Sequence, residues 1–299
     1  MESSELLAMQ RAVQRGWTND RRWHVGDLAW QRYHQPGREA GWRTRIWRDG
    51  AGEAIGWGWL RLPGQLDLHV DPRLPELAGE VLDWFAATAP TAERTVTVLS
   101  TEGHLRAALE RAGYGVEEDA PHFAHHLQEL DADLPVPAPP AGYRIRPVRP
   151  DEAAERAAVH RAAWRPARIG TLLVPPEDLG DGESRVTTES YGSVMAAWPY
   201  RTDLDQVVEA ADGTLAASAL GWLDADNRVG LLEPVGTDPR HARLGLGAAV
   251  SLACLHAMRA AGATRVVVRP RGDAGYPVPG RLYRALGFRE TARTVAYRS

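Results

Sequence analysis

The sequence predicts an α/β fold with a mixed sheet, built twice as two tandem domains. Three observations lead to this prediction. A chain of 299 residues is long enough for two domains of ordinary size. Residues 132–141 are rich in proline and have no hydrophobic period, which is typical of a linker. The parts on either side, 1–131 and 142–299, end in segments with the same pattern.

The repeated pattern covers two pairs of segments. Residues 92–119 and 263–291 each contain a β-branched strand, a loop, a short amphipathic helix and a glycine-aromatic step. Residues 66–85 and 231–252 each change from a strand to a helix. The period is too long for a solenoid, so the pattern indicates a duplicated domain.

The elements of the second half follow one another in a clear order. They are a strand over 143–150, a helix over 151–164, two strands over 204–224, a strand over 228–237, a helix after a glycine loop, a strand over 264–270, a helix around 280–286 and a closing strand over 291–299. We expect Asp151 to cap the first helix and Asp212-Gly213 to form the hairpin turn.

Composition excludes several classes of function. The chain is 44% hydrophobic and 25% charged, with mean hydropathy -0.36, as in soluble globular proteins. No apolar run approaches the ~18 residues of a membrane span, and the acidic N-terminus is unlike a signal peptide. We therefore expect a cytoplasmic protein without a membrane partner. The net charge of -4 disfavours nucleic acid. All basic residues are arginine, so a P-loop, which needs lysine, is excluded.

Two glycines, Gly245 and Gly247, stand where the strand over 228–237 passes into a helix. The first N–H groups of a helix have no internal partner, and glycine lets a phosphate come close to them. The alternative is a tight turn that binds nothing. A dinucleotide-binding fingerprint would need glycine at position 250, where the chain has Val250.

At these residues the sequence resembles the GCN5-related N-acetyltransferase (GNAT) superfamily. The resemblance rests on "RLGLGA" (243–248) and "LYRALGF" (282–288), and it covers Gly142 to Ser299. The tandem arrangement resembles that of mycothiol synthase-like proteins. The family's loop pattern begins with Gln or Arg, and this chain has Ala242 there.

The resemblance implies acetyl-CoA as cosubstrate, its pyrophosphate on the glycine loop and its pantetheine paired along the preceding strand. Tyr276 stands where the family usually has an asparagine. The cosubstrate contacts expected on this basis come from Val235, Gly236, Thr237, Arg243, Leu244, Gly245, Leu246, Gly247, Ala248 and Tyr276.

Two residues are candidates for catalysis. Tyr283 matches the family's tyrosine that protonates the leaving thiolate, although a helix tyrosine can also simply pack into the core. Glu233 is a carboxylate in an apolar strand, two residues from Val235, and is the candidate general base. A solvated strand end is the alternative for Glu233. Glu209 and Asp224 are further candidates, while Pro234 indicates a bulge or break in the strand.

The first half lacks both signatures. Carboxylates, Glu76 and Glu80, stand at the helix start where the second half has glycines, and they would repel a phosphate. Leu109 aligns with Tyr283. We therefore expect a degenerate N-terminal domain without catalytic activity.

The function expected is direct transfer of an acetyl group to a small-molecule amine. The alternatives are a non-catalytic acyl-CoA sensor or scaffold and a transferase for a longer acyl-CoA. Aromatic and acidic residues of segment 189–205 suit a cationic amine: Tyr191, Trp198, Tyr200, Glu189, Asp203 and Asp205. No metal is expected, because the spacing of His122, His125 and His126 matches no common zinc pattern. The sequence leaves the oligomeric state open.

Overall fold

The strands and helices divide between two compact units, neither of which is one continuous stretch of chain. In the computed structural model, unit 1 comprises Met1–Leu28, Gly37–Leu127 and Arg269–Ser299, and unit 2 comprises Ala29–Pro36 and Gln128–Val268. The structure describes residues 3–130, 133–165, 170, 184–272 and 276–299. Residues 131 and 132, at the predicted start of the linker, lie outside the described residues.

The compact units differ from the predicted ranges 1–131, 132–141 and 142–299 at two segments. Residues 29–36 belong to unit 2, although they precede the linker. Residues 269–299, expected in the second domain, belong to unit 1. The reason is strand β12 (Arg289–Arg298), which pairs antiparallel with β4 (Thr95–Leu99).

Unit 1 has a mixed sheet with the order β1-β2-β3-β4-β12, and β5 and β6 also pair with β12. The pair β3–β4 is parallel, and the others are antiparallel. Its elements are α1 (Ser3–Arg15), the start of α2 (Val25–Tyr33), β1 (Trp42–Arg48), β2 (Ala54–Arg61), β3 (Gln65–Val70), α3 (Leu77–Thr88), β4, α4 (Gly103–Arg111), β5 (Gly115–Val116), most of β6 (Ala124–Glu129), α9 (Val278–Ala285) and β12.

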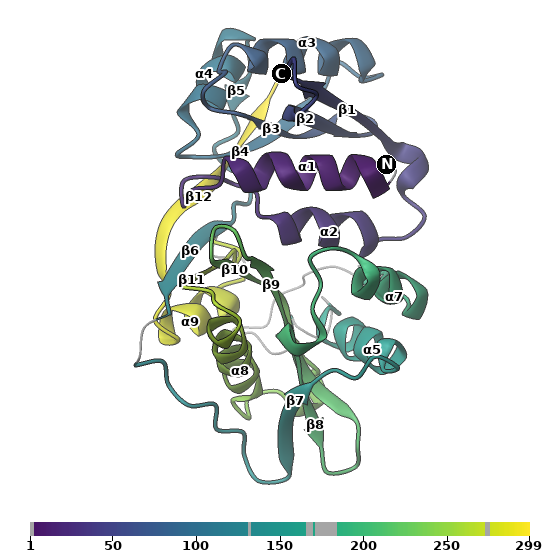
Figure 1. Cartoon of the computed structure of the whole chain (residues 1–299), viewed down its shortest axis with the longest axis vertical. Coiled ribbons are helices and arrows are strands. Elements are labelled where there is room, and N and C mark those ends of the chain that lie inside the picture. The colour runs from purple at the N-terminus through teal and green to yellow at the C-terminus, as the bar shows by residue number, and fades with distance from the viewer. Residues whose placement is uncertain (1–2, 131–132, 166–169, 171–183, 273–275) are drawn as a thin grey trace. The chain divides into compact units, whose positions relative to one another are not determined.

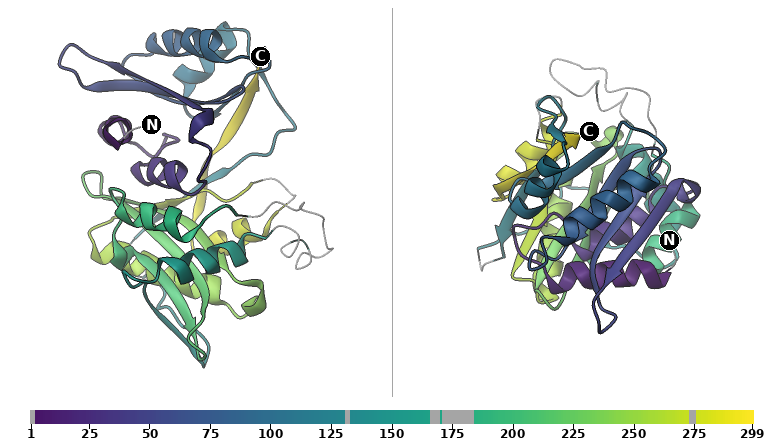
Figure 2. Two further views of the ribbon diagram at one scale, coloured as in Figure 1. Left: turned by 90° about the vertical axis from the view of Figure 1, so that its right-hand side faces the viewer. Right: turned by 90° about the horizontal axis from the view of Figure 1, so that it is seen from above.

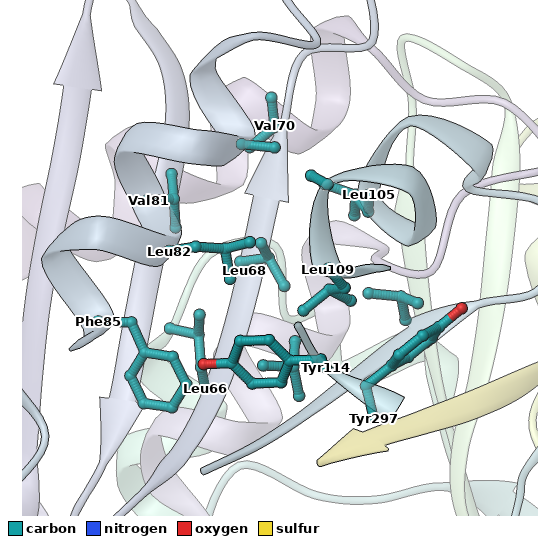
Figure 3. Close-up of a cluster of buried hydrophobic side chains, with 14 of the residues drawn as sticks. Leu66, Leu68, Val70, Val81, Leu82, Phe85, Leu105, Leu109, Tyr114 and Tyr297 are labelled. Carbon is teal, nitrogen blue, oxygen red and sulfur yellow. The ribbon is translucent and has the colours of Figure 1, made fainter. Parts of the chain in front are cut away.

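The core of unit 1 lies between β3 and the helices α3 and α4. Leu66, Leu68 and Val70 alternate onto one face of β3 and meet apolar residues of both helices, such as Phe85 and Leu109 (Figure 3). Helix α1 lies on the opposite face of the strands (Figure 2). The sheet of unit 1 is therefore covered by helices on both faces.

Unit 2 repeats this plan with the strand order β11-β10-β9-β8-β7. Helix α8 covers one face, and α5 and α7 cover the other (Figure 1). Only β10–β11 is parallel. Its elements are β7 (Tyr143–Pro147), α5 (Ala153–Ala163), α7 (Thr188–Ala196), β8 (Asp205–Ala210), β9 (Leu215–Asp224), β10 (Val229–Thr237), α8 (Leu246–Ala260) and β11 (Arg265–Val268). One-turn 3-10 helices occur at Glu39–Gly41, Thr202–Leu204 and Pro239–His241.

The predicted mixed α/β fold is confirmed, with one correction and two elements that were not predicted. Asp151 does not cap α5, because the N-cap is Glu152, whose carboxylate accepts instead from Arg146 and Arg149. Residues 188–196, for which no helix was predicted, form helix α7, which opens with a capping box between Thr187 and Ser190. His125 and His126 lie in strand β6, which was not predicted either.

Candidate active site

Strand β10 separates from β11 partway along its length. The parallel pairing runs from Val229 opposite Arg265 to Leu231 opposite Val267 and then stops, whereas β10 continues to Thr237. On its other side β10 stays paired with β9 as far as Thr237 opposite Ala217. The last six residues of β10 therefore present one strand edge beyond the β11 ladder.

The strand carries a bulge where it opens. Leu232 lies opposite Gly221 and Val235 opposite Ala219, so two residues of β10 face Leu220 alone. The bulge predicted from Pro234 is confirmed. The indole N–H of Trp222 donates a 2.7 Å hydrogen bond to the carbonyl oxygen of Glu233. Trp222 is fully buried and so fixes the bulge from the neighbouring strand.

The bulge changes which side of the sheet successive residues face. A Cβ on Gly230, before the bulge, would meet Met258 of α8, whereas a Cβ on Gly236, after it, would meet Ala163 of α5. Glu233 lies opposite Leu220, on the α5 side, while Val235 pairs with Ala219 on the α8 side. The expectation that Glu233 and Val235 share a face was therefore wrong, because the extra residue inverts the alternation.

The backbone of the open edge points away from β9. The N–H of Asp238 donates to the carbonyl of Ala216 in β9 at 2.9 Å. Because backbone groups alternate in direction along a strand, those of Thr237 and Val235 face the opposite edge. These are the two residues from which strand-like pairing was predicted.

The glycine loop joins this edge to the start of α8. Gly245 is the N-cap of α8, with φ of 76°, and no side chain caps the helix. Arg243 also has positive φ, 63°, which is uncommon for a residue with a Cβ. The first turn of α8 contains no acidic residue, and Gly245 is exposed. The loop thus presents uncapped N–H groups and the positive end of the helix dipole.

The residues before the loop are fixed by Asp238. Its carboxylate accepts from the backbone N–H of Arg240 at 2.9 Å and from the guanidinium at 2.7 Å. Burial favours the neutral acid, but the bonds from Arg240 outweigh it and lower the pKa of Asp238. The ring of His241 is partly buried and forms a 2.9 Å hydrogen bond with the hydroxyl of Tyr143.

The alternative bases are already engaged. Glu209 forms ion pairs with Arg144 and Arg146, and the hydrogen bond from Arg146 lowers the pKa of its carboxyl group. Asp224 is fully buried and accepts from the side chain of Asn227 at 2.6 Å. Glu233 is half-buried at the bulge. Of the three carboxylates, Glu233 is the one that lies in the open part of strand β10.

The two predicted tyrosines belong to unit 1, whereas strand β10 and the glycine loop belong to unit 2. Tyr283 is in α9, buried to 6% exposure, with its ring edge-on to Phe288 at 5.7 Å. Tyr276 precedes α9, and burial raises the pKa of its phenol. The assembly of both with the glycine loop remains a prediction.

The predicted acceptor wall needs correction. Asp205 and Tyr191 are completely buried. Asp205 accepts from Nε of Arg156 at 2.9 Å and from the hydroxyls of Tyr191 and Tyr200. Asp203 is paired with Arg201 at the surface. Because these acids are neutralised within the protein, they are not available to attract a cationic amine; the exposed Trp198 and Glu189 remain.

Unit 1 has a different structure at the corresponding place. Helix α3 begins after Glu76 as N-cap and carries Glu80 in its first turn. Leu109, aligned with Tyr283, is 1% exposed in the apolar core (Figure 3). The start of α3 therefore carries carboxylates where the start of α8 carries glycines.

The histidines of β6 lie on different faces of their strand. His125 and His126 are neighbours on one strand and therefore point to opposite faces. Among the described residues, no group of three or more His, Cys, Asp or Glu side chains is arranged to hold a metal ion.

Comparisons with known proteins agree with this geometry. Residues 177–288 match the model of the Acetyltransferase (GNAT) family. A search of curated proteins gives no significant match. A tandem GNAT protein from the clavulanic acid biosynthesis pathway superposes with TM-score 0.61 at 20% identity, covering 99% of this chain and 93% of that one. A GCN5-related N-acetyltransferase from Sphaerobacter thermophilus gives 0.59 at 21% identity, covering 100% and 93%.

The family match and the similar structures agree on the same fold. Residues 177–288, which include the open strand and the glycine loop, match the GNAT family model, and the whole chain shares the fold of a tandem GNAT protein. Proteins of this family generally use acetyl-CoA. Among the described residues, no helix has the length and apolar character needed to cross a membrane.

Sequence reasoning missed one residue of this site. Trp222 holds the bulge through Glu233, but it reads in the sequence as an ordinary core tryptophan of a strand. The signal that could have found it is the combination of a proline in one strand and a tryptophan in its hairpin partner.

Proposed function

We propose that this protein is an acetyl-CoA-dependent N-acetyltransferase that acts on a small-molecule amine by direct transfer. The observation that carries the proposal is the open edge of β10, which leads from the bulge at Glu233 directly to the uncapped start of α8. An extended pantetheine arm can pair with such an edge, and a pyrophosphate can sit on such a helix start.

The residues of the chain have separate tasks in this scheme. Backbone groups of Val235 and Thr237 hold the pantetheine arm, and those of residues 243–248 hold the pyrophosphate. Glu233 takes a proton from the ammonium group of the acceptor, and Tyr283 gives a proton to the thiolate that leaves. The new C–N bond forms as the C–S bond breaks, so the products are an amide and free coenzyme A.

The experiment is the release of thiol from acetyl-CoA, followed over a panel of small amines and a series of acyl donors. We expect turnover that depends on the amine and falls with longer acyl chains. Binding of acetyl-CoA with no turnover of any amine would contradict the enzyme and leave the sensor or scaffold. Faster turnover with a longer acyl donor would show that the protein transfers a longer acyl group and not acetyl.

A further inference from the structure

An exposed tryptophan lies on the α5 side of β10, just beyond the bulge. Trp164 is the C-cap of α5 and is 46% exposed. Its indole nitrogen is 3.6 Å from the position that a Cβ on Gly236 would take, and the Cβ of Ala163 is 2.6 Å from the same position. Any side chain at Gly236 would push this end of α5 away. Glycine there brings the indole directly onto the strand.

The indole is supported from behind by other rings of unit 2. The ring centroid of His160 is 5.8 Å away at 31°, and His160 meets Trp30 edge-on at 5.3 Å. Trp30 in turn stacks on His34 at 5.0 Å. Burial lowers the pKa of His160 well below its usual value, so the ring behind Trp164 is neutral near pH 7. This packing holds one side of the indole and leaves the rest exposed.

The indole and the candidate base share one side of the sheet. Glu233 lies opposite Leu220, on the side that faces α5, and Gly236 faces Ala163 on that same side. Because the bulge makes Glu233 and Pro234 share one partner, the two residues are only two regular strand positions apart, which corresponds to about 7 Å along a strand. This spacing matches an amine held at one end by Glu233 while its other end reaches the indole.

The charges around Trp164 limit what that other end can be. Arg165 follows it directly and is exposed. Arg161 lies one helical turn earlier, where its guanidinium donates to the carbonyl of Val186 at 2.8 Å. A second positive charge on the acceptor would be repelled by both arginines. A flat uncharged ring would stack on the indole without that cost.

We propose that Trp164 is a specificity-determining residue that binds the aromatic end of the acceptor, so that the preferred substrates are arylalkylamines and not diamines. This inference rests on the proposed function, because it takes β10 as the place where the amine meets the thioester. It replaces the acidic acceptor wall expected from segment 189–205.

The experiment compares W164A, W164F and W198A with the unchanged chain. Trp198 is also partly exposed, at 37%, and serves as the matched control. Calorimetry measures the binding of 2-phenylethylamine, hexylamine and 1,4-diaminobutane, with and without coenzyme A, and acetyl-CoA is titrated separately. Turnover of the same amines is measured by thiol release.

We expect 2-phenylethylamine to bind most tightly, and W164A to weaken it about tenfold. W164F should recover most of this loss, W198A should cause none, and acetyl-CoA should bind all four proteins equally. Tighter binding of the diamine, no detectable binding of 2-phenylethylamine, or equal weakening of all three amines by W164A would overturn the inference. If any of these results came with normal acetyl-CoA binding, the proposed function would still stand. If the unchanged chain did not bind acetyl-CoA at all, the proposed function itself would be overturned.

Discussion

The strand-to-helix connections of the two units, β3–α3 and β10–α8, begin with the same turn and then diverge. Asp71 accepts from the backbone N–H of Arg73 at 2.9 Å, as Asp238 does from Arg240, and each aspartate also pairs with that arginine's guanidinium. From this aspartate, α3 begins six residues later and α8 eight residues later. The duplicated turn survives in unit 1, but the two residues and the glycines that extend the loop do not.

The edges of the two strands differ in what occupies them. In unit 1, the indole N–H of Trp23 donates to the carbonyl of Leu68 at 2.8 Å, and the ring of His104 contacts the carbonyl of Val70 at 3.3 Å. The shared turn makes these carbonyls the counterparts of those of Val235 and Thr237. Side chains of unit 1 therefore already contact the backbone carbonyls that correspond to those proposed to hold pantetheine in unit 2.

Strands β3 and β10 also differ at the residue between these two carbonyl groups. His69 of β3 corresponds to Gly236 of β10 and is buried between the strand and α1. In unit 2 the glycine leaves that position to Ala163 and Trp164 of α5. A position filled by an imidazole in one unit is thus a close helix contact beside an open surface in the other.

The helices that end at the glycine-aromatic step match closely. The N–H of Tyr114 donates to the carbonyl of Leu109 at 3.0 Å, and the N–H of Phe288 donates to that of Tyr283, also at 3.0 Å. Gly113 and Gly287 both have positive φ, as this helix ending requires. Leu109 and Tyr283 are therefore equivalent in backbone geometry, and only the phenol distinguishes them.

The largest effect is expected from a charge at the start of α8. Gly247→Glu places a carboxylate where the pyrophosphate would sit, so acetyl-CoA binding measured by calorimetry should be abolished. Gly79→Glu is the matched control, since Gly79 is exposed with open space around it in the first turn of α3. Undiminished binding in Gly247→Glu, or equal loss in both variants, would contradict the phosphate cradle.

Removing the phenol tests the equivalence of Tyr283 and Leu109. Tyr283→Phe keeps the ring packed against Phe288 but removes the proton donor, so kcat should fall about 10²-fold or more while the KM for acetyl-CoA changes little. Tyr114→Phe, at the glycine-aromatic step of unit 1, should leave kcat unchanged. If Tyr283→Phe turned over a good acceptor at the normal rate, the assignment of the general acid would be wrong.

The sequence predicted what depends on local chemistry. The succession of the predicted strands and helices along the second half, the bulge at Pro234 and the turn at Gly213 follow from β-branched runs, proline and glycine, and the structure confirms them. It did not predict that β12 would pair with β4 of unit 1, because strand partners are set by tertiary packing. The burial of Asp205 was missed for a related reason, since its partner Arg156 is 49 residues away in the chain.

The difference between His69 and Gly236 predicts an acid sensitivity located in unit 1. Burial, reinforced by Arg21, lowers the pKa of His69 from 6.5 to about 4. The unfolded chain therefore binds this proton more readily, so the contribution of His69 is fully present above pH 6.5 and is lost as the pH falls toward 4. At about 1.4 kcal/mol per pKa unit, the loss is about 3 kcal/mol.

Chemical denaturation of the unchanged chain and of His69→Gln, at pH 7 and pH 4, measures this loss. Other buried histidines, such as His125 and His160, also lower the free energy of unfolding in acid. They are present in both proteins, so the difference between the two proteins in this pH dependence isolates His69. Parallel profiles would show that His69 keeps an ordinary pKa in the folded protein.

The smallest effects come from removing one indole N–H in each unit. Trp23 donates to Leu68 in β3, and Trp222 donates to Glu233 in β10. Replacing either by Phe leaves a carbonyl without its donor, so each variant should lose about 1 kcal/mol of unfolding free energy. Only Trp222→Phe should also lower kcat several-fold and displace the acid limb of the pH–rate profile, because only that bond holds the bulge that carries Glu233. Equal kinetics in the two variants would mean that the bulge is held without Trp222, and that the two units differ at their open edges alone.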